Sequence, residues 1–185
     1  MNVTEAINTR RAYRSLDHTE ITEELIKDLA YHADLSASCG NHQPWRFVFV
    51  YAKNQLANIH AVLPKGNKWM ELSSMIIAVF SRADDDCIVK DRIYHQFDTG
   101  MATAFLILRA TELGLIAHPV AGFDEAAVKQ ILRIPENNQV ITLINVGKHS
   151  DLIHPYLSEK QVATEKERPA RYPFERFAYL NQYQD

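Results

Sequence analysis

The chain has 185 residues and a net charge of −3; hydrophobic residues make up 46% of it and charged residues 23%. These fractions are typical of a globular protein with a buried core, and the length suits a single domain over residues 1–185. Binding to nucleic acid depends on an excess of clustered lysine and arginine. The negative net charge therefore argues against nucleic acid as the main partner.

The sequence shows no targeting or membrane-spanning segment. Met1 to Glu5 lack a charged stretch followed by an apolar one, and the longest apolar runs, 75–80 and 101–108, are too short to span a bilayer. Cys39 and Cys87 form no Cys-x-x-Cys pair and predict no disulfide framework. We therefore expect a cytoplasmic protein that does not bind membranes.

The first predicted elements are two helices and a strand. Residues 3–11 predict a short helix with Thr4 as its N-cap, and Thr22 is expected to cap a second helix that continues to about Ala33. Residues 46–51 are apolar and follow a loop of small and polar residues, so they predict a strand.

The middle of the chain predicts a buried strand between two helices. Residues 56–63 show helical spacing, and 75–80 form a continuous apolar run that is typical of a buried strand. The longest helical pattern covers 91–113 and is apolar almost all round between 101 and 110, which places it in the core or at an interface. Gly114 suits the position just after the end of this helix.

The last part predicts two strands, a helix and an aromatic tail. Residues 116–120 and 140–146 indicate strands, and Asp124 is expected to cap a helix that ends before Pro135. Residues 151–185 have weak periodicity and many aromatic side chains, so we expect them to pack on a second subunit. Because helices and strands do not alternate strictly, the pattern favours an α+β fold over a doubly wound parallel sheet.

The segment 36–45 reads Ser-Ala-Ser-Cys-Gly-Asn-His-Gln-Pro-Trp and joins the second helix to the first strand. Gly40 lets the backbone approach another group closely, and Asn41 and Gln43 each offer two donors and an acceptor. Pro44 disfavours the helical region for Gln43, which predicts an extended conformation there. Composition alone leaves two interpretations open, an ordinary loop or a contact with a planar polar ligand.

Arg10, Arg11 and Arg14 form a dense basic run at the end of the first predicted helix. If that helix continued, Arg10 and Arg14 would share a face and repel weakly. One interpretation is structural, because the C-terminal end of a helix attracts cations. The other is an anion site, because guanidinium groups bind phosphate in a bidentate manner.

In their order and spacing, these segments resemble the nitroreductase family of flavin enzymes. The match rests on the arginine run at 10–14 and on Ser-x-x-Asn-x-Gln-Pro-Trp at 38–45, with looser matches at 66–69, 98–100, 113–124 and 171–175. Ala12, Leu16 and Ala37 depart from the serine, phenylalanine and proline that are usual in the family.

The resemblance implies an FMN-dependent enzyme in which NADH or NADPH delivers hydride to flavin N5. The reduced flavin then passes electrons to a nitroaromatic, a quinone or a related small acceptor in a ping-pong exchange. It further implies a nitroreductase-like fold with a mostly antiparallel sheet between helices, in an entangled homodimer that exchanges its C-terminal tails. Because the flavin carries the chemistry, no catalytic side chain is expected.

Two other functions remain open at this stage. A non-catalytic flavin-binding or sensor protein would carry the same motifs. A reductive dehalogenase-type enzyme would share the fold, but such enzymes carry a large lid, and the chain is short between Trp69 and Asp98.

The resemblance also assigns cofactor contacts. Ser38 and Asn41 are expected to reach FMN from the other subunit, and the backbone of 119–122 to approach the ring near N5. Arg171, or alternatively Arg168, is expected at the phosphate. The residues expected to bind FMN are Arg10, Arg11, Ala12, Arg14, Ser38, Asn41, Gln43, Asn67, Pro119, Val120, Ala121, Gly122 and Arg171.

Other polar groups predict no further site. The eight histidines show no metal-ligand spacing, so no metal is expected. The three aspartates at 84–86 predict a solvated turn. His95 and Asp98 are expected to form a surface pair on a helix. Trp45 is expected in the core.

Overall fold

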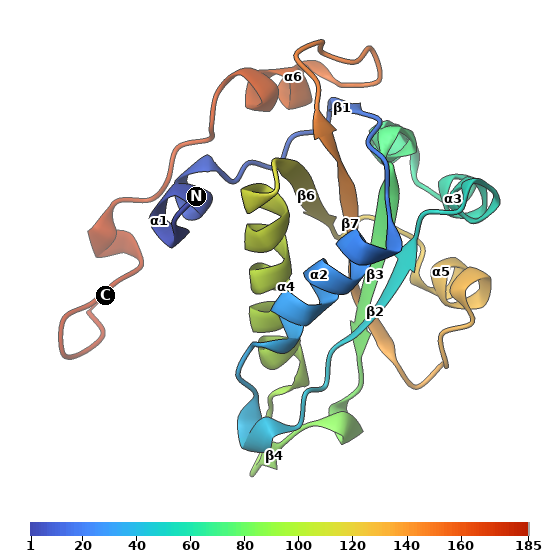
Figure 1. Cartoon of the computed structure of the whole chain (residues 1–185). Helices are drawn as coiled ribbons and strands as arrows, with labels where there is room; N and C mark the ends of the chain where they lie inside the picture. Colours follow the sequence, from blue (N-terminus) through green and yellow to red (C-terminus); the bar gives the residue numbers. More distant parts are fainter. Residues whose placement is uncertain (185) are drawn as a thin grey trace.

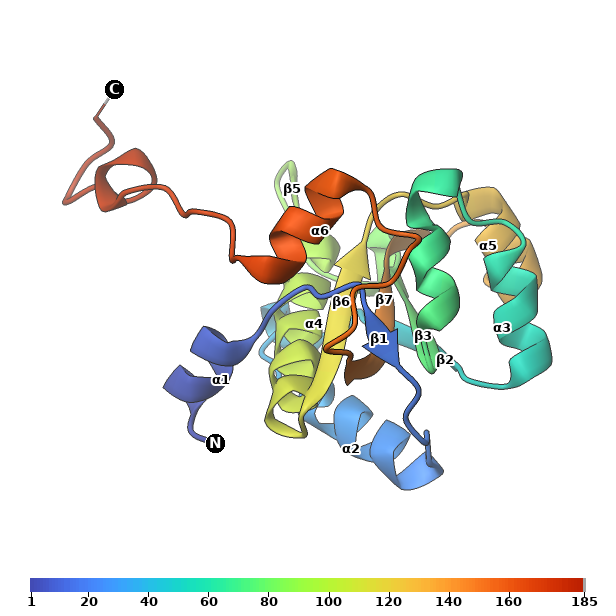
Figure 2. The same cartoon turned by 90° about the horizontal axis from the view of Figure 1, so that it is seen from above.

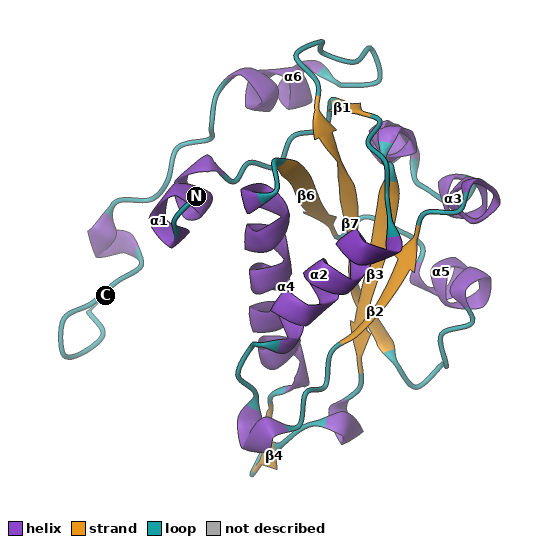
Figure 3. Cartoon of the chain, in the orientation of Figure 1, coloured by secondary structure: helices purple, strands orange, loops and turns teal. Residues whose placement is uncertain are grey.

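The computed structural model describes residues 1–184. An antiparallel sheet lies between two layers of helices (Figures 1 and 3). The helices are α1 (Val3–Thr9), α2 (Glu23–Asp34), α3 (Lys53–His60), α4 (His95–Glu112), α5 (Glu125–Leu132) and α6 (Glu159–Lys166). The strands are β1 (Leu16–Asp17), β2 (Arg46–Val50), β3 (Met75–Ser81), β4 (Ile88–Val89), β5 (Arg92–Ile93), β6 (Leu115–Val120) and β7 (Gln139–His149). Short 3₁₀ helices cover Cys39–Asn41, Lys65–Leu72, Ala83–Asp85 and Phe174–Arg176.

The strand β7 organises the main sheet. The five strands follow the order β1-β7-β3-β2, with β6 also paired to β7, and every pairing in this sheet is antiparallel. Ile144 of β7 faces Ile77 of β3, and Val146 faces Ala117 of β6. The α+β prediction with an antiparallel sheet is therefore confirmed. The strands β4 and β5 form a separate hairpin.

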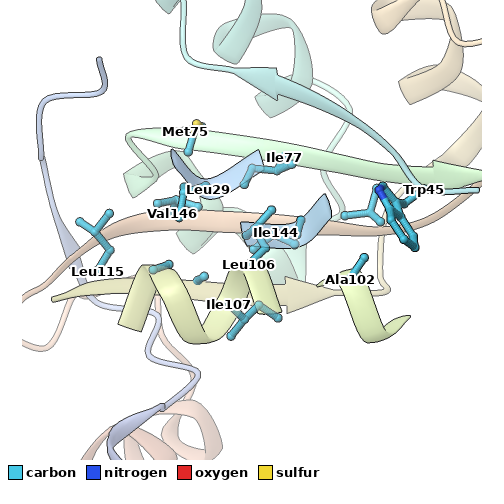
Figure 4. Close-up of a cluster of buried hydrophobic side chains, with 14 residues drawn as sticks. Leu29, Trp45, Met75, Ile77, Ala102, Leu106, Ile107, Leu115, Ile144 and Val146 are labelled. Carbon is cyan, nitrogen blue, oxygen red and sulfur yellow. The ribbon is translucent and has the colours of Figure 1, made fainter. Parts of the chain in front are cut away.

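Both faces of the sheet are buried. Alternate side chains of β3 point to opposite faces, and each set packs in its own cluster. Met75, Ile77 and Val79 pack with residues of α2 and α4, such as Leu29 and Leu106, in the cluster shown in Figure 4. The other face of β3 presents Ile76 and Ala78 to a second cluster, formed with α3, α5 and the 3₁₀ helix at 65–72. Two-sided burial explains why β3 reads as a continuous apolar run rather than an alternating one.

Several element boundaries differ from the predictions. Asn2, not Thr4, caps α1, because its side chain accepts from the N–H of Glu5 and the Glu5 carboxylate accepts from the N–H of Asn2. The helix ends at Thr9, so Arg10 and Arg14 do not share a helix face. The caps at Thr22 and Asp124 are confirmed.

The long helix α4 begins at His95 rather than at residue 91, because Arg92 and Ile93 pair with β4. The expected surface pair on this helix is wrong. His95 and Asp98 are 7% and 2% exposed; the His95 ring bonds to the Ser81 hydroxyl, and Asp98 accepts from the N–H of Cys39. Gly114 has φ +75° and follows the helix as predicted.

The prediction that the two cysteines form no disulfide is also wrong. Cys39 and Cys87 form a disulfide with a Cα–Cα distance of 5.9 Å, across a separation of 48 residues. Spacing in the sequence gave no sign of this pair, because the fold brings the turn before β2 against the segment after β3.

The helix α6 lies within the tail whose periodicity is weak, and it holds the arginine run in place. The carboxylate of Glu165 is buried and accepts from the N–H groups of Arg14 and Ser15, at 2.8 and 3.1 Å. Beyond α6 the chain leaves the body of the molecule (Figure 2). No helix among the described residues is long and apolar enough to cross a membrane.

His118 of β6 is a buried polar residue behind the arginine run. Its ring is 6% exposed, and Nδ1 lies 3.0 Å from the carbonyl oxygen of Tyr13, so Nδ1 carries the proton that is donated. The ring stacks on Trp69 at a centroid distance of 4.7 Å. Burial lowers the pKa of His118 to about 4, and the nearby charges of Arg14 and Arg10 also act in this direction.

The low pKa of His118 makes the stability of the protein sensitive to acid. The pKa of His118 in the folded protein lies below the ordinary 6.5 of histidine. The contribution of neutral His118 to the free energy of unfolding is therefore complete above pH 6.5 and is lost as the pH falls through about 4. When the pH is lowered from 7 to 4.5, the free energy of unfolding should fall by about 2 kcal/mol less in His118→Gln than in the parent. Urea denaturation at the two pH values measures this difference. The matched control is His18→Gln at an exposed site. Equal acid sensitivity in the parent and in both variants would contradict this assignment.

Candidate functional site

Arg10 is the centre of an uncompensated positive cluster. Its half-buried guanidinium makes no hydrogen bond or ion pair with any residue in 1–184. Burial lowers the pKa of Arg10, and the charges of Arg168 and Arg171 lower it further, so three guanidinium groups lie near one another. Like charges brought together without an acidic partner favour binding of an anion.

The neighbouring arginines of the run have structural partners. Arg11 donates through Nη2 to the carbonyl oxygen of Thr164 at 2.7 Å, and Arg14 through Nη1 to the Thr164 hydroxyl at 3.0 Å. These contacts place Arg11 and Arg14 against α6. Ala12 lies between them and is exposed.

The two candidates for a phosphate contact differ in their partners. Arg168 donates through Nη2 to the carbonyl oxygens of Asn8 and Arg10, at 2.6 and 2.8 Å. Arg171 is exposed and has no hydrogen bond or ion pair within the described residues. Of the two, Arg171 therefore has the guanidinium that is free for a ligand.

A stack of rings joins the arginine run to β6. The Arg14 guanidinium lies over the Trp69 ring at 5.5 Å, and Trp69 in turn stacks on His118. The Nε1 of Trp69 is buried, and no acceptor for it is found in residues 1–184. Sequence reasoning missed both rings, because a lone tryptophan and a lone histidine beside apolar runs look like ordinary core residues.

Asn67 and Gly122 form a close contact between two loops. The Asn67 amide donates to the carbonyl oxygen of Gly122 at 2.6 Å, and a Cβ on Gly122 would lie 2.9 Å from Nδ2 of Asn67. A side chain at position 122 would therefore displace the Asn67 amide. Pro119 and Val120 end β6, and Ala121 lies between β6 and Gly122. The structure thus brings 119–122 and Asn67 into one region.

This region adjoins the arginine cluster. The charges of Arg10 and Arg14 act on His118, which directly precedes 119–122 in the chain. From α6, Gln161 donates to the carbonyl oxygen of Gly66 at 3.2 Å. The expected residues at 10–14, Asn67 and 119–122 therefore belong to one surface, built on β6 and α6.

Ser38, Asn41 and Gln43 do not join this surface within one chain. The turn that carries them lies at the N-terminal end of α4, beside β4, whereas β1 and α6 lie beyond the other end of the helix (Figure 1). The Ser38 hydroxyl accepts from the N–H of Gln43 at 2.9 Å, so it is used within the turn.

The conformation of this turn departs from the expected one. Gly40, Asn41 and Gln43 have φ values of +55°, +60° and +52°. Pro44 does exclude the right-handed helical region for Gln43, but Gln43 lies in the left-handed region rather than in the extended one. Trp45 is 6% exposed and lies in the core, as predicted.

Acidic groups lie behind the turn. Asp98 accepts from the N–H of Cys39 at 2.6 Å. Burial and the nearby Asp98 raise the pKa of Asp86, whose Oδ2 is buried without a partner in the described part of the chain. Asp85 instead pairs with Arg82 at 2.7 Å in a 3₁₀ turn. No group of three or more His, Cys, Asp or Glu residues in 1–184 could hold a metal ion.

Known proteins resemble this chain over most of its length. A model of the nitroreductase family matches residues 7–148. A Methanothermobacter thermautotrophicus protein, named as a candidate NADH dehydrogenase/NAD(P)H nitroreductase, is 29% identical over 152 residues, which are 80% of this chain and 77% of that protein.

Two further relatives are informative. An iodotyrosine dehalogenase 1 homolog of Caenorhabditis elegans is 26% identical over 85% of this chain and 58% of its own length. A crystal structure described as an oxidoreductase containing FMN has a TM-score of 0.84 and 26% identity, and the match covers all of this chain and 94% of that one.

The family match spans the arginine run, the turn before β2, Asn67 and the 119–122 segment. It leaves out residues 1–6 and 149–185. The chain belongs to the nitroreductase family.

Proposed function

We propose that the protein is an FMN-dependent oxidoreductase that takes electrons from NADH or NADPH and reduces a small acceptor such as a nitroaromatic or a quinone. The observation that carries this proposal is the convergence of Arg10, Arg168 and Arg171, in which Arg10 has no acidic partner in residues 1–184. The names of its relatives support the nicotinamide and flavin parts of the proposal.

The residues present fit FMN. A phosphate needs fixed cations, and the guanidinium groups of Arg10 and Arg171 are free to supply them. A flavin ring needs a flat approach and polar contacts at its edge, which the small residues Ala121 and Gly122 and the amide of Asn67 offer. Arg11 and Arg14 would act mainly by holding the backbone of the run against α6.

Bound FMN supplies the group that accepts hydride and passes electrons on. The protein's residues bind and orient it, and no side chain is assigned a catalytic role. Because the nicotinamide and the acceptor would use the same pocket in turn, we expect ping-pong kinetics.

A dehalogenase is the second candidate, favoured by the similarity to the C. elegans protein. In this chain the segment between β3 and α4 folds as a 3₁₀ turn and the hairpin β4–β5, which leaves little chain for a lid. The reductase therefore remains the first candidate.

The protein is further proposed to act as a homodimer of single-domain subunits (1–185) in the cytoplasm, with the tail at 151–185 on the partner. Phe174, Phe177 and Leu180 are 54%, 65% and 73% exposed on the tail that leaves the body (Figure 2). An apolar groove of about 380 Å³ between α1, α2 and α4 could receive such a segment from a second copy. A dimer could also bring Ser38, Asn41 and Gln43 to the partner's FMN.

The proposed activity predicts a yellow protein whose flavin absorption bleaches under NADH or NADPH without oxygen. The visible spectrum before and after addition checks this, and return of the bands on adding a nitroaromatic or a quinone identifies the acceptor class. Persistent bands would indicate a flavin-binding protein without a nicotinamide route. No bands after reconstitution with FMN would contradict the proposal.

Arg10→Ala should weaken FMN binding by about ten- to a hundredfold, because charge-assisted hydrogen bonds contribute roughly 1.5–3 kcal/mol. Quenching of FMN fluorescence on titration gives the dissociation constant. The control is Arg92→Ala, an exposed arginine in the β4–β5 hairpin. Unchanged affinity in Arg10→Ala would remove Arg10 from the site.

Deletion of residues 172–185 should convert the dimer to a monomer, because it removes the exposed aromatic side chains and leaves Arg168 and Arg171 in place. Sedimentation velocity measures the oligomeric state, and circular dichroism checks that the shortened chain is folded. A folded, dimeric deletion variant would show that the tail does not hold the dimer together.

A further inference from the structure

Among residues 1–184, the turn that carries Ser38, Asn41 and Gln43 has one covalent bond and one hydrogen bond to residues outside the segment 38–46. These are the Cys39–Cys87 disulfide and the hydrogen bond from the N–H of Cys39 to Asp98, and His42 also interacts electrostatically with Asp86. The remaining hydrogen bonds of residues 38–43 are local to the segment 38–46.

The backbone of this turn is held in an unfavourable conformation. Three of its residues are left-handed, and only one of them is glycine. Asn41 tolerates such a φ better than most residues, whereas Gln43 has no such advantage. A conformation of this kind persists only where the surroundings impose it.

The disulfide lies in a partly exposed part of the fold. Cys39 and Cys87 are half-buried, and the neighbouring residues Gly40 and Ile88 are exposed. Gly40 also keeps this side open, because a Cβ there would lie 3.6 Å from the sulfur of Cys87 and 2.9 Å from the His42 ring. A half-buried cysteine pair beside exposed residues is the kind of site that a thiol reagent is expected to reach.

We propose that Cys39–Cys87 is a reversible thiol–disulfide modification site whose natural reductant is a dithiol, and that its redox state controls the turn at 38–43. The thiolate of the dithiol attacks one sulfur and forms a mixed disulfide, and the other cysteine leaves and takes up a proton. The second thiol of the reductant then resolves the mixed disulfide, so two electrons pass to the cysteines and the reductant becomes a disulfide.

Two carboxylates bond to the backbone at the cysteines. The carboxylate of Asp98 bonds to the backbone of Cys39, and Asp86 directly precedes Cys87 and bonds to its N–H at 2.7 Å. Cysteine pairs of this kind in cytoplasmic proteins are usually transient or redox-sensing, which agrees with the proposed location.

The consequence for FMN rests on the proposed function. In the oxidised protein the turn is fixed before FMN binds, whereas in the reduced protein binding has to order it. Reduction should therefore raise the dissociation constant for FMN, by about five- to 150-fold if the coupling is of ordinary size.

The test compares the full chain before and after treatment with dithiothreitol. A thiol reagent applied to the denatured protein, purified without reductant, should find no free thiol in Cys39 or Cys87 before treatment and two after it. FMN affinity, by fluorescence quenching in the dark, should fall on reduction. The double variant Cys39→Ser/Cys87→Ser should bind like the reduced parent and should not respond to dithiothreitol.

Amide hydrogen exchange of residues 38–43, measured without FMN, gives a second readout. Faster exchange after reduction supports the inference, and unchanged exchange in the reduced parent and the double variant overturns it. Two free thiols before treatment, or the same FMN affinity in both redox states, would also overturn it. If neither state binds FMN, the proposed function fails, and hydrogen exchange alone decides whether the disulfide controls the turn.

Discussion

The buried carboxylate of Glu165 fixes the segment on which the candidate anion site is built. It accepts from two successive backbone N–H groups, at Arg14 and Ser15, and so holds α6 against the chain that enters β1. A buried carboxylate requires such partners, because an unpaired charge in the interior is strongly unfavourable.

With α6 in place, Arg11 and Arg14 bond to Thr164, and Arg168 reaches the backbone of Asn8 and Arg10. Arg10 and Arg171 are left without partners among the described residues.

Much of the fold could be predicted from the sequence, because its signals are local. The apolar run of β3, the cap at Thr22 and the turn residue Gly114 each depend on neighbouring residues alone. The helix α6 was missed because its apolar pattern is weak, and its place depends on Glu165 and on contacts 150 residues away in the chain. Long-range contacts of this kind leave no periodic signal.

The candidate site was predictable only in part, because its motifs are local in the sequence whereas the contacts that occupy some of its residues are long-range. A resemblance in motif order pointed to Arg10, Asn67 and Gly122, but it could not tell which arginines are used within the protein. The disulfide was not predicted either, since two cysteines 48 residues apart gave no recognisable spacing. Asp98 lies on an apparently exposed turn of a helix, and only the fold shows that the turn before β2 covers it.

The two halves of the proposed FMN site are held by different kinds of interaction. The half with Arg10, Asn67 and 119–122 is anchored by β6, which pairs with the central strand β7, and by α6. Such a half keeps its geometry as long as the protein is folded. The turn at 38–43 lies outside the sheet, and within residues 1–184 its bonds to residues outside the segment 38–46 are one hydrogen bond and one disulfide. A chemical change at that covalent bond can therefore alter one half of the site while the sheet and the other half stay intact, which is the physical requirement for control without unfolding.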